Sequence, residues 1–313
     1  MWRPILPASA EVRSGELTVA GCSISDLAGA YGTPLYVFDE SAVRQAARRT
    51  VQAFQGMDTR VSFAAKACAT VAVLQIIRHE GIELDVVSAG EMEAARRAGF
   101  EPCSMHLHGN VKTDAELVEA VREGVRAIVL DSLAELERLR QICNELRANA
   151  SVLLRLALPL QADTHPSLRT AATSKFGFDS AAEAQAIDML RGCERVRLIG
   201  LHCHLGSQIT DASLYRRSLE SLASRVDRLR DAGFLLEELS IGGGWAVPYR
   251  PGDAELTPHA VAAAVIARAI GLPHNPVHAA VAARHKATMR QLLSEAAVAS
   301  PGFLVFDRDE DPE

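Results

Sequence analysis

Residues 127–148 read AIVLDSLAELERLRQICNELRA, and this stretch decides which fold the chain can adopt. It begins with a short, mainly apolar run of the kind that forms a buried strand. From Leu133 onward, apolar residues recur at steps of three and four, so they fall on one face of a helix. The stretch therefore predicts one strand followed directly by one helix.

The same strand–helix alternation recurs along most of the chain. Further strands are expected at residues 61–67, 84–88, 104–110, 152–158, 197–207 and 236–244, with helices between them. About seven such units without a hairpin signature predict a parallel sheet, because each helical crossover returns the chain to the same end of the sheet. Eight units would close a TIM-type (β/α)8 barrel, whose sites lie at the C-terminal ends of the strands.

The competing architecture is a doubly wound open sheet. That fold predicts a glycine-rich turn after the first strand, and residues 63–70, FAAKACAT, contain no glycine. We therefore expect an α/β fold of the (β/α)8 barrel type, complete or lacking its last unit. A further strand is expected outside the barrel at residues 34–39, PLYVFD.

Composition excludes several classes of protein. The 313 residues are 48% hydrophobic, and their charges, which sum to -6, are interleaved along the chain. This pattern lacks the basic stripe of a nucleic-acid-binding surface and the polybasic patch of a membrane-binding one. The N-terminus lacks the long apolar segment of a secretory signal, and no stretch is long and apolar enough to span a membrane. A cytoplasmic protein is expected.

Cysteine and histidine patterns give no sign of a disulfide framework or a metal site. The chain has no C-x-x-C pair among its six cysteines, which are Cys22, Cys68, Cys103, Cys143, Cys193 and Cys203. Free, buried thiols are the expected state of such cysteines in a cytoplasmic protein. Two His-x-His clusters, at 106–108 and 202–204, are not accompanied by a cysteine pair or an H-E-x-x-H helix. No metal is expected.

A single charged residue, Lys66, interrupts the small and apolar run VSFAAKACATVAV at residues 61–73. Because side chains alternate along a strand, Ser62, Ala64 and Lys66 are expected to share the face that points into the barrel. Lys66 then lies at the C-terminal end of the first barrel strand, where barrel enzymes carry their chemistry. From this stretch alone, a structural ion pair is the alternative, since a buried charge must be paired or shifted in pKa.

Two later strand ends carry residues suited to an anionic ligand. His202 and His204 are expected to share one face of the strand at 197–207, which ends in a Gly-Ser turn. The next strand runs into three glycines, 242–244, whose successive backbone N–H groups can converge on an anion because no Cβ is in the way. At the end of the seventh strand of a barrel, such a turn lies where phosphate groups often bind.

The chain resembles the alanine-racemase-like, pyridoxal-phosphate-dependent group IV decarboxylases, which act on ornithine, diaminopimelate or arginine. The resemblance covers roughly residues 15–255 and rests on the ordered segments GELTVAGCSISDLAGAYGTPLYVFDE, FAAKA, LDVVSAGE, LHGNVKT, THPSLRTAATSKFGF, GLHCHLGSQITD and GGGWAVPYRPGD. Three of them, HGNVKT, THP and HCHLGSQ, are most similar to the members that act on diaminopimelate. The resemblance implies pyridoxal 5'-phosphate as cofactor, an amino-acid substrate, decarboxylation of meso-diaminopimelate to L-lysine in lysine biosynthesis, and a homodimer.

The resemblance also assigns roles to residues of the barrel: Lys66, Asp85, Arg155, His204, Ser207, Gly242, Gly243 and Gly244. Lys66 and His204 are the expected catalytic residues. Lys66 would form the internal aldimine with the cofactor, which requires a neutral amine, and His204 would stack on the pyridine ring. Ser207 and the three glycines would hold the phosphate, and Arg155 would lie beside the cofactor. Asp85 would pair with a cation near the aldimine. For Asp85 and Arg155, a structural salt bridge is the alternative.

The resemblance ends before the C-terminus. Members of the family continue with an eighth strand that ends in Glu-Pro-Gly-Arg, and with a β-domain that completes the partner subunit's site. This sequence contains no Glu-Pro-Gly-Arg, and Asp307 and Arg308 are the candidates to replace its charged residues. We therefore expect weak or lost activity. The alternatives are a non-catalytic pyridoxal-phosphate-binding barrel, a relative acting on another basic amino acid, and an unstable fragment.

Three parts of the chain are expected. Residues 1–40 form an N-terminal segment whose strand normally pairs with the β-domain of the family. Residues 41–260 form the pyridoxal-phosphate-binding barrel. Residues 261–313 form a divergent helical tail, in which 302–309 is a candidate last strand.

Overall fold

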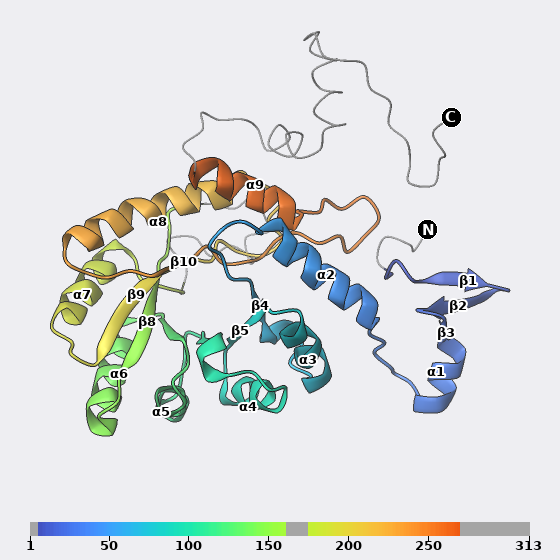
Figure 1. The fold of residues 1–313 in the computed structure, drawn as a ribbon, viewed down its shortest axis with the longest axis horizontal. Coiled ribbons are helices and arrows are strands. Elements are labelled where there is room, and N and C mark those ends of the chain that lie inside the picture. Colours follow the sequence, from blue (N-terminus) through green and yellow to red (C-terminus); the bar gives the residue numbers. More distant parts are fainter. Residues whose placement is uncertain (1–5, 161–174, 270–313) are drawn as a thin grey trace, which may run out of the picture.

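The computed structural model describes residues 6–160 and 175–269. Its main element is a parallel sheet in the order β10-β9-β8-β7-β6-β5-β4, so strands that follow one another in sequence are neighbours in space (Figure 1). The strands are β4 (Ser62–Ala64), β5 (Glu83–Val86), β6 (Met105–Leu107), β7 (Ala127–Leu130), β8 (Ala150–Arg155), β9 (Val196–His202) and β10 (Glu238–Ser240). This order confirms the expected series of parallel strand–helix units.

Helices precede, connect and follow the strands, and they lie outside the curved sheet (Figure 1). They are α2 (Glu40–Ala53), α3 (Val71–His79), α4 (Ala89–Arg97), α5 (Asp114–Glu123), α6 (Leu133–Leu146), α7 (Ser180–Arg191), α8 (Ser213–Asp231) and α9 (Pro258–Ala269), with short 3-10 turns η2 (Ala65–Ala67) and η3 (Pro102–Ser104). The stretch 127–148 forms β7 and α6, as its pattern predicts.

Short polar residues fix where several of these helices begin. The side chains of Ser88, Ser132 and Asp179 accept hydrogen bonds from backbone N–H groups in the first turns of α4, α6 and α7. Thr113 forms a capping box with Glu116 at the start of α5. Because each helix starts directly after a strand–helix loop, these caps also position the loops at the C-terminal ends of the strands.

The two faces of each strand have different surroundings. In β5, Leu84 and Val86 are fully buried in the core between the sheet and the helices. Asp85, which lies between them in sequence, contacts His106 and His108 instead. Alternation of side chains along a strand produces this difference. The main apolar core therefore lies outside the sheet. The concave interior carries polar side chains such as Asp85 together with a small apolar cluster, Ala127, Val129, Leu153 and Ile199.

The sheet curls far enough for its first and last strands to approach each other, although within residues 6–160 and 175–269 no ladder joins β4 to β10. Glu238 of β10 lies 3.1 Å from His106 of β6, measured from Oε2 to Nε2, and also pairs with Arg126. Arg60, just before β4, lies 3.6 Å from Glu238. Outside the sheet, α9 packs against both α8 and α2. The architecture is thus of the (β/α)8 barrel type, with seven strands described.

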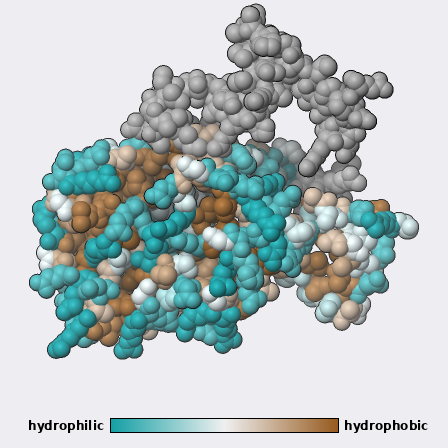
Figure 2. Space-filling view, in the orientation of Figure 1, coloured by the Kyte–Doolittle hydropathy of each residue, from teal (hydrophilic) through white to brown (hydrophobic). Residues whose placement is uncertain are grey.

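The N-terminal segment forms a unit whose strands the sequence patterns did not predict. It contains an antiparallel sheet of β1 (Glu11–Arg13), β2 (Glu16–Val19) and β3 (Cys22–Ser23), followed by α1 (Ile24–Tyr31). Figure 2 shows apolar surface on this unit.

The prediction of a strand at 34–39 was wrong. These residues pair with no described strand, and an extended segment without a partner gains no ladder hydrogen bonds. Its apolar side chains are exposed, with Tyr36 at 90%.

The cysteines are free, as expected. Cys22 and Cys103 are nevertheless exposed, so the expectation of buried thiols was wrong for these two. Among the described helices, none combines the length and the apolar character needed to cross a membrane. Asp307, Arg308 and the candidate strand at 302–309 lie outside the described residues.

Candidate active site

Lys66 lies directly after β4, at the C-terminal end of the barrel strands. The strand itself ends at Ala64, and Lys66 belongs to the 3-10 turn η2. The prediction that Lys66 continues the inward face of a strand over 61–67 was therefore wrong, while its place at the strand end is confirmed. In this turn Ala65 is fully buried and Lys66 is exposed, so the core anchors the turn and leaves the amine at the barrel mouth.

Asp85 provides an anion on the neighbouring strand. Its Oδ1 accepts a hydrogen bond from Ser62 at 2.5 Å, and its Oδ2 lies 3.5 Å from Nε2 of His108. Burial by itself raises the pKa of Asp85, but His108, Ser62 and His106 outweigh it and lower the pKa to about 2. Asp85 is thus ionised at neutral pH, and its described partners are histidines and a serine.

His202 and His204 differ in position although only one residue separates them. The strand β9 ends at His202, so the prediction that both lie on one face of a strand over 197–207 was wrong. His202 is buried, and its ring meets that of His108 edge to face, with centroids 5.0 Å apart. His204 follows in the loop. Burial, then the charges of Arg155 and Lys66, lower the pKa of His204 to about 4. His204 is therefore a neutral ring at neutral pH.

The three glycines after β10 pack directly against the loop that carries His204 and Ser207. A Cβ at Gly242 would lie 2.5 Å from the carbonyl oxygen of Cys203 and 3.0 Å from Nδ1 of His204. A Cβ at Gly244 would collide with the carbonyl oxygen of Gly206, the residue before Ser207. Both glycines also have positive φ, 69° and 92°. Close approach and backbone conformation together require glycine at both positions.

The amides of this glycine loop are available to a ligand. Among the residues that the structure describes, no backbone carbonyl accepts from the N–H groups of Gly242, Gly243 or Gly244. A Cβ built on Gly243 would meet no atom within 4 Å, so the loop borders open space at this point. Successive N–H groups without a backbone acceptor can converge on an anion. The donors fit a phosphate group.

Arg155 forms the ion pair that was the alternative to its cofactor-binding role. One guanidinium nitrogen, Nη1, lies 3.3 Å from Oδ1 of Asp131, in the loop after β7. The guanidinium also lies over the ring of Phe176, 4.7 Å from its centroid. Burial lowers the pKa of Arg155, and Asp131 opposes this effect. A role of Arg155 beside the cofactor remains a prediction.

Reasoning from the sequence missed three residues near the barrel mouth. His108 contacts Asp85, Asp131 contacts Arg155, and Tyr215 donates a hydrogen bond to the carbonyl of Gly243. The His-x-His pattern at 106–108 matches the one at 202–204 and gave a signal for His108. Asp131 and Tyr215 had no comparable signal, because their partners are far away in sequence.

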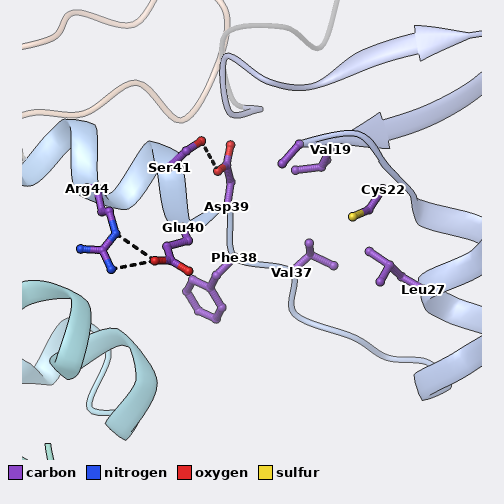
Figure 3. Close-up of a pocket in the computed structure, with 10 residues that line it drawn as sticks. Val19, Cys22, Leu27, Val37, Phe38, Asp39, Glu40, Ser41 and Arg44 are labelled. Atoms are coloured by element: carbon purple, nitrogen blue, oxygen red, sulfur yellow. Dashed lines mark hydrogen bonds and ion pairs between the residues drawn. The ribbon is translucent and has the colours of Figure 1, made fainter.

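A pocket elsewhere in the chain contains none of the predicted site residues. It lies between the N-terminal sheet, α1 and the start of α2, and the close-up labels Val19, Cys22, Leu27, Val37, Phe38, Asp39, Glu40, Ser41 and Arg44 (Figure 3). Its carboxylate Asp39 is the N-cap of α2. Hydrogen bonds from Ser41 and Ser9 and the backbone N–H of Ala42 lower the pKa of Asp39 to about 2. The role of Asp39 as the helix cap explains why its pKa is lowered, so this carboxylate does not indicate a second site. The barrel mouth remains the candidate site.

Three comparisons with known proteins agree. The family model "pyridoxal-dependent decarboxylase, pyridoxal binding domain" matches residues 40–280. The diaminopimelate decarboxylase of Bacillus subtilis (strain 168) is 37% identical over 254 residues, which are 79% of this chain and 58% of that protein. That of Mycobacterium leprae is 39% identical over 250 residues, covering 77% and 52%. The solved structure of the M. jannaschii diaminopimelate decarboxylase in co-complex with L-lysine has a TM-score of 0.78 at 30% identity, covering 84% of this chain and 63% of that one.

The coverage of the relatives limits what the match establishes. This chain spans between half and three fifths of the length of the two curated relatives. The family model, in contrast, covers most of the chain, including β4 to β10 and the residues at the barrel mouth. A lysine at a strand end, a neutral, partly buried histidine and a glycine cradle fit pyridoxal phosphate. The chain belongs to the pyridoxal-dependent decarboxylase family, and it contains the pyridoxal-binding domain of that family.

Proposed function

We propose that this chain binds pyridoxal 5'-phosphate through Lys66 and serves the decarboxylation of meso-diaminopimelate to L-lysine. The observation that carries the proposal is the meeting of Lys66, Asp85, His204 and the loop 242–244 at one end of the barrel. The names of the B. subtilis and M. leprae relatives support diaminopimelate as substrate. The L-lysine in the M. jannaschii structure is the expected product.

Each group at the mouth has a task suited to its state. Lys66 presents an exposed amine, which becomes a nucleophile when it loses its proton. His204 presents a neutral ring, which can stack without bringing a second positive charge. Asp85 places a fixed negative charge on the strand next to Lys66. When bound, the cofactor supplies the electron sink for decarboxylation.

The glycine loop and Ser207 are proposed to hold the phosphate end. The N–H groups of the loop can donate to phosphate oxygens. Ser207 lies beside the loop, because the residue before it contacts Gly244. We further propose that the protein is a cytoplasmic homodimer. Light scattering coupled to gel filtration tests the dimer, and a monomeric mass with and without cofactor would contradict it.

A second candidate function is that of a non-catalytic pyridoxal-phosphate carrier. The observation that favours it is the lack of a Glu-Pro-Gly-Arg segment in the sequence, although the family resemblance implies one after the last strand. A carrier would bind the cofactor at the same residues and turn over no amino acid.

One experiment separates the candidates. The protein is purified with pyridoxal phosphate, and the visible absorbance of the bound cofactor is compared with that of Lys66→Ala. meso-Diaminopimelate is then added, and lysine and CO2 are measured, with ornithine and arginine as alternative substrates. Cofactor binding that depends on Lys66, followed by release of lysine, supports the decarboxylase. Binding without any turnover supports the carrier, and no binding contradicts both.

A further inference from the structure

Tyr215 links α8 to the glycine loop. It lies in the first turn of α8, is fully buried, and donates a hydrogen bond from its hydroxyl to the carbonyl oxygen of Gly243 at 3.0 Å. The surrounding cluster is apolar and includes Leu205, Ile209 and Ala246. Burial raises the pKa of Tyr215, so the hydroxyl keeps its proton and remains a donor.

This hydrogen bond fixes the direction of one N–H group. The peptide between Gly243 and Gly244 is trans, since the cis bond found in the described residues joins Thr33 to Pro34. In a planar trans peptide, the carbonyl and the following N–H point in opposite directions. Because the carbonyl of Gly243 points to Tyr215 on α8, the N–H of Gly244 points away from α8, to the side of the barrel mouth.

A second anchor acts on the same loop. The carbonyl oxygen of Gly244 accepts a hydrogen bond from the backbone N–H of Ile209 at 2.9 Å. The protein thus binds the carbonyls of Gly243 and Gly244, whereas in the described part of the chain no carbonyl accepts from their N–H groups. Glycine backbones are otherwise free to adopt many conformations. The first anchor orients the N–H of Gly244 and the second orients that of Trp245, so together they restrict the conformations open to the loop.

We propose that Tyr215 is a positioning residue that holds the glycine loop open toward the phosphate group of the cofactor, a role that rests on the proposed function and deepens it. The hydroxyl acts through the loop and does not itself contact the phosphate. A phenylalanine would fill the same space in the apolar cluster, so packing alone does not require the hydroxyl. The hydroxyl should therefore matter for the phosphate end of the ligand and not for its aldehyde end.

The test compares two ligands that differ only in the phosphate. Dissociation constants for pyridoxal phosphate and for pyridoxal are measured by absorbance in wild type, Tyr215→Phe and Ser218→Ala. Ser218 is the matched control, because its buried hydroxyl also lies on α8 but bonds to the carbonyl of Tyr215 and to the thiol of Cys203, not to the glycine loop. Losing the bond to a buried carbonyl should weaken binding of pyridoxal phosphate by about tenfold in Tyr215→Phe. Binding of pyridoxal should stay nearly unchanged.

The ratio of the two constants decides the result. A preference for pyridoxal phosphate that falls in Tyr215→Phe and persists in Ser218→Ala supports the proposal. An unchanged preference in Tyr215→Phe, or an equal loss for both ligands, overturns it, since a merely structural hydroxyl acts on both alike. A wild-type protein that binds neither ligand overturns the proposed function as well, so the two failures are distinguishable.

Discussion

Oδ2 of Asp85 and Nε2 of His108 lie 3.5 Å apart at the mouth of the barrel, on neighbouring strand ends. The two residues are 23 positions apart in sequence, and the parallel strands β5 and β6 bring them into contact. Ser62 donates a hydrogen bond to Asp85, and the ring of His202 packs edge to face against the ring of His108. Asp85 therefore places a fixed negative charge next to the turn that carries Lys66.

Replacing Asp85 by asparagine should make the stability of the protein less dependent on acid pH. The pKa of Asp85 is lowered from 3.8 to about 2 in the folded state, which corresponds to about 2 kcal/mol of unfolding free energy. This contribution is present above pH 3.8 and is lost as the pH falls toward 2, because the unfolded state binds the proton first. The free energy of unfolding of wild type and Asp85→Asn is measured in urea at several pH values. The difference between the two should shrink as the pH falls from 3.8 toward 2.

The control for this measurement is Asp188→Asn on α7. Asp188 has a side chain that is 74% exposed, in a surface pair with Arg191, and exposed pairs of this kind contribute little. Equal effects of both substitutions, or a difference for Asp85→Asn that does not vary with pH, would contradict the account.

His204 should remain uncharged well below neutral pH. Its pKa is lowered from 6.5 to about 4. Between pH 6.5 and pH 4, His204 is therefore protonated in the unfolded state and neutral in the folded state. The unfolding free energy should therefore fall as the pH falls from 6.5 toward 4. An NMR titration of the His204 ring should give a midpoint near 4, and a midpoint near 6.5 would show that the ring is not buried among cations.

Two single substitutions in the glycine loop should differ in their effect on the stability of the protein. Gly244→Ala places a Cβ against the carbonyl of Gly206 in a residue with φ of 92°, and should cost about 1–3 kcal/mol of unfolding free energy. Gly243→Ala meets no atom within 4 Å and should leave the stability nearly unchanged. Thermal unfolding of the two variants checks this contrast, and similar melting temperatures would mean that the loops are not packed as described.

The buried pair of Lys112 and Glu135 should behave as one unit. The Nζ of Lys112 donates to Glu135 at 2.5 Å and to the carbonyls of Gly109 and Val129, and its side chain is fully buried. Burial lowers the pKa of Lys112 and raises that of Glu135, with each partner opposing the shift of the other. Lys112→Met should therefore cost about 3–5 kcal/mol by leaving a buried carboxylate unpaired.

A double-mutant cycle in urea measures this coupling. The variant that combines Lys112→Met with Glu135→Leu should lose less stability than the two single losses added together, because no buried charge is left without a partner. Strict additivity would show that the two residues act independently.

The sequence predicted the order of strands and helices well because hydrophobic periodicity governs both. The errors gather at the C-terminal ends of strands, where the predicted ranges 61–67, 197–207 and 236–244 all extend beyond β4, β9 and β10. At these ends the chain leaves the hydrogen-bond ladder and forms the loops of the site. The residues of these loops are apolar or glycine-rich, so in the sequence they resemble the continuation of a strand. The strand expected at 34–39 failed for a different reason, since no described strand lies beside it to form a ladder.

The candidate site was also only partly predictable from the sequence. Lys66, Asp85, His204 and the glycines could be named from the sequence, because each stands out at a strand end or in a recognisable segment. The contacts of Asp85 with His108, of Arg155 with Asp131 and of Tyr215 with Gly243 could not. They depend on which strands and helices become neighbours, and on the side of the loop that each carbonyl faces.

The proposed attachment of the cofactor to Lys66 can be tested directly, because the chain contains few lysines. The chain contains four lysines, at positions 66, 112, 175 and 286. Protein incubated with pyridoxal phosphate is reduced with borohydride, digested and examined by mass spectrometry. We predict the cofactor's mass on the peptide that contains Lys66, and no label in Lys66→Arg. Label on the other lysines, or retained in Lys66→Arg, would contradict this prediction.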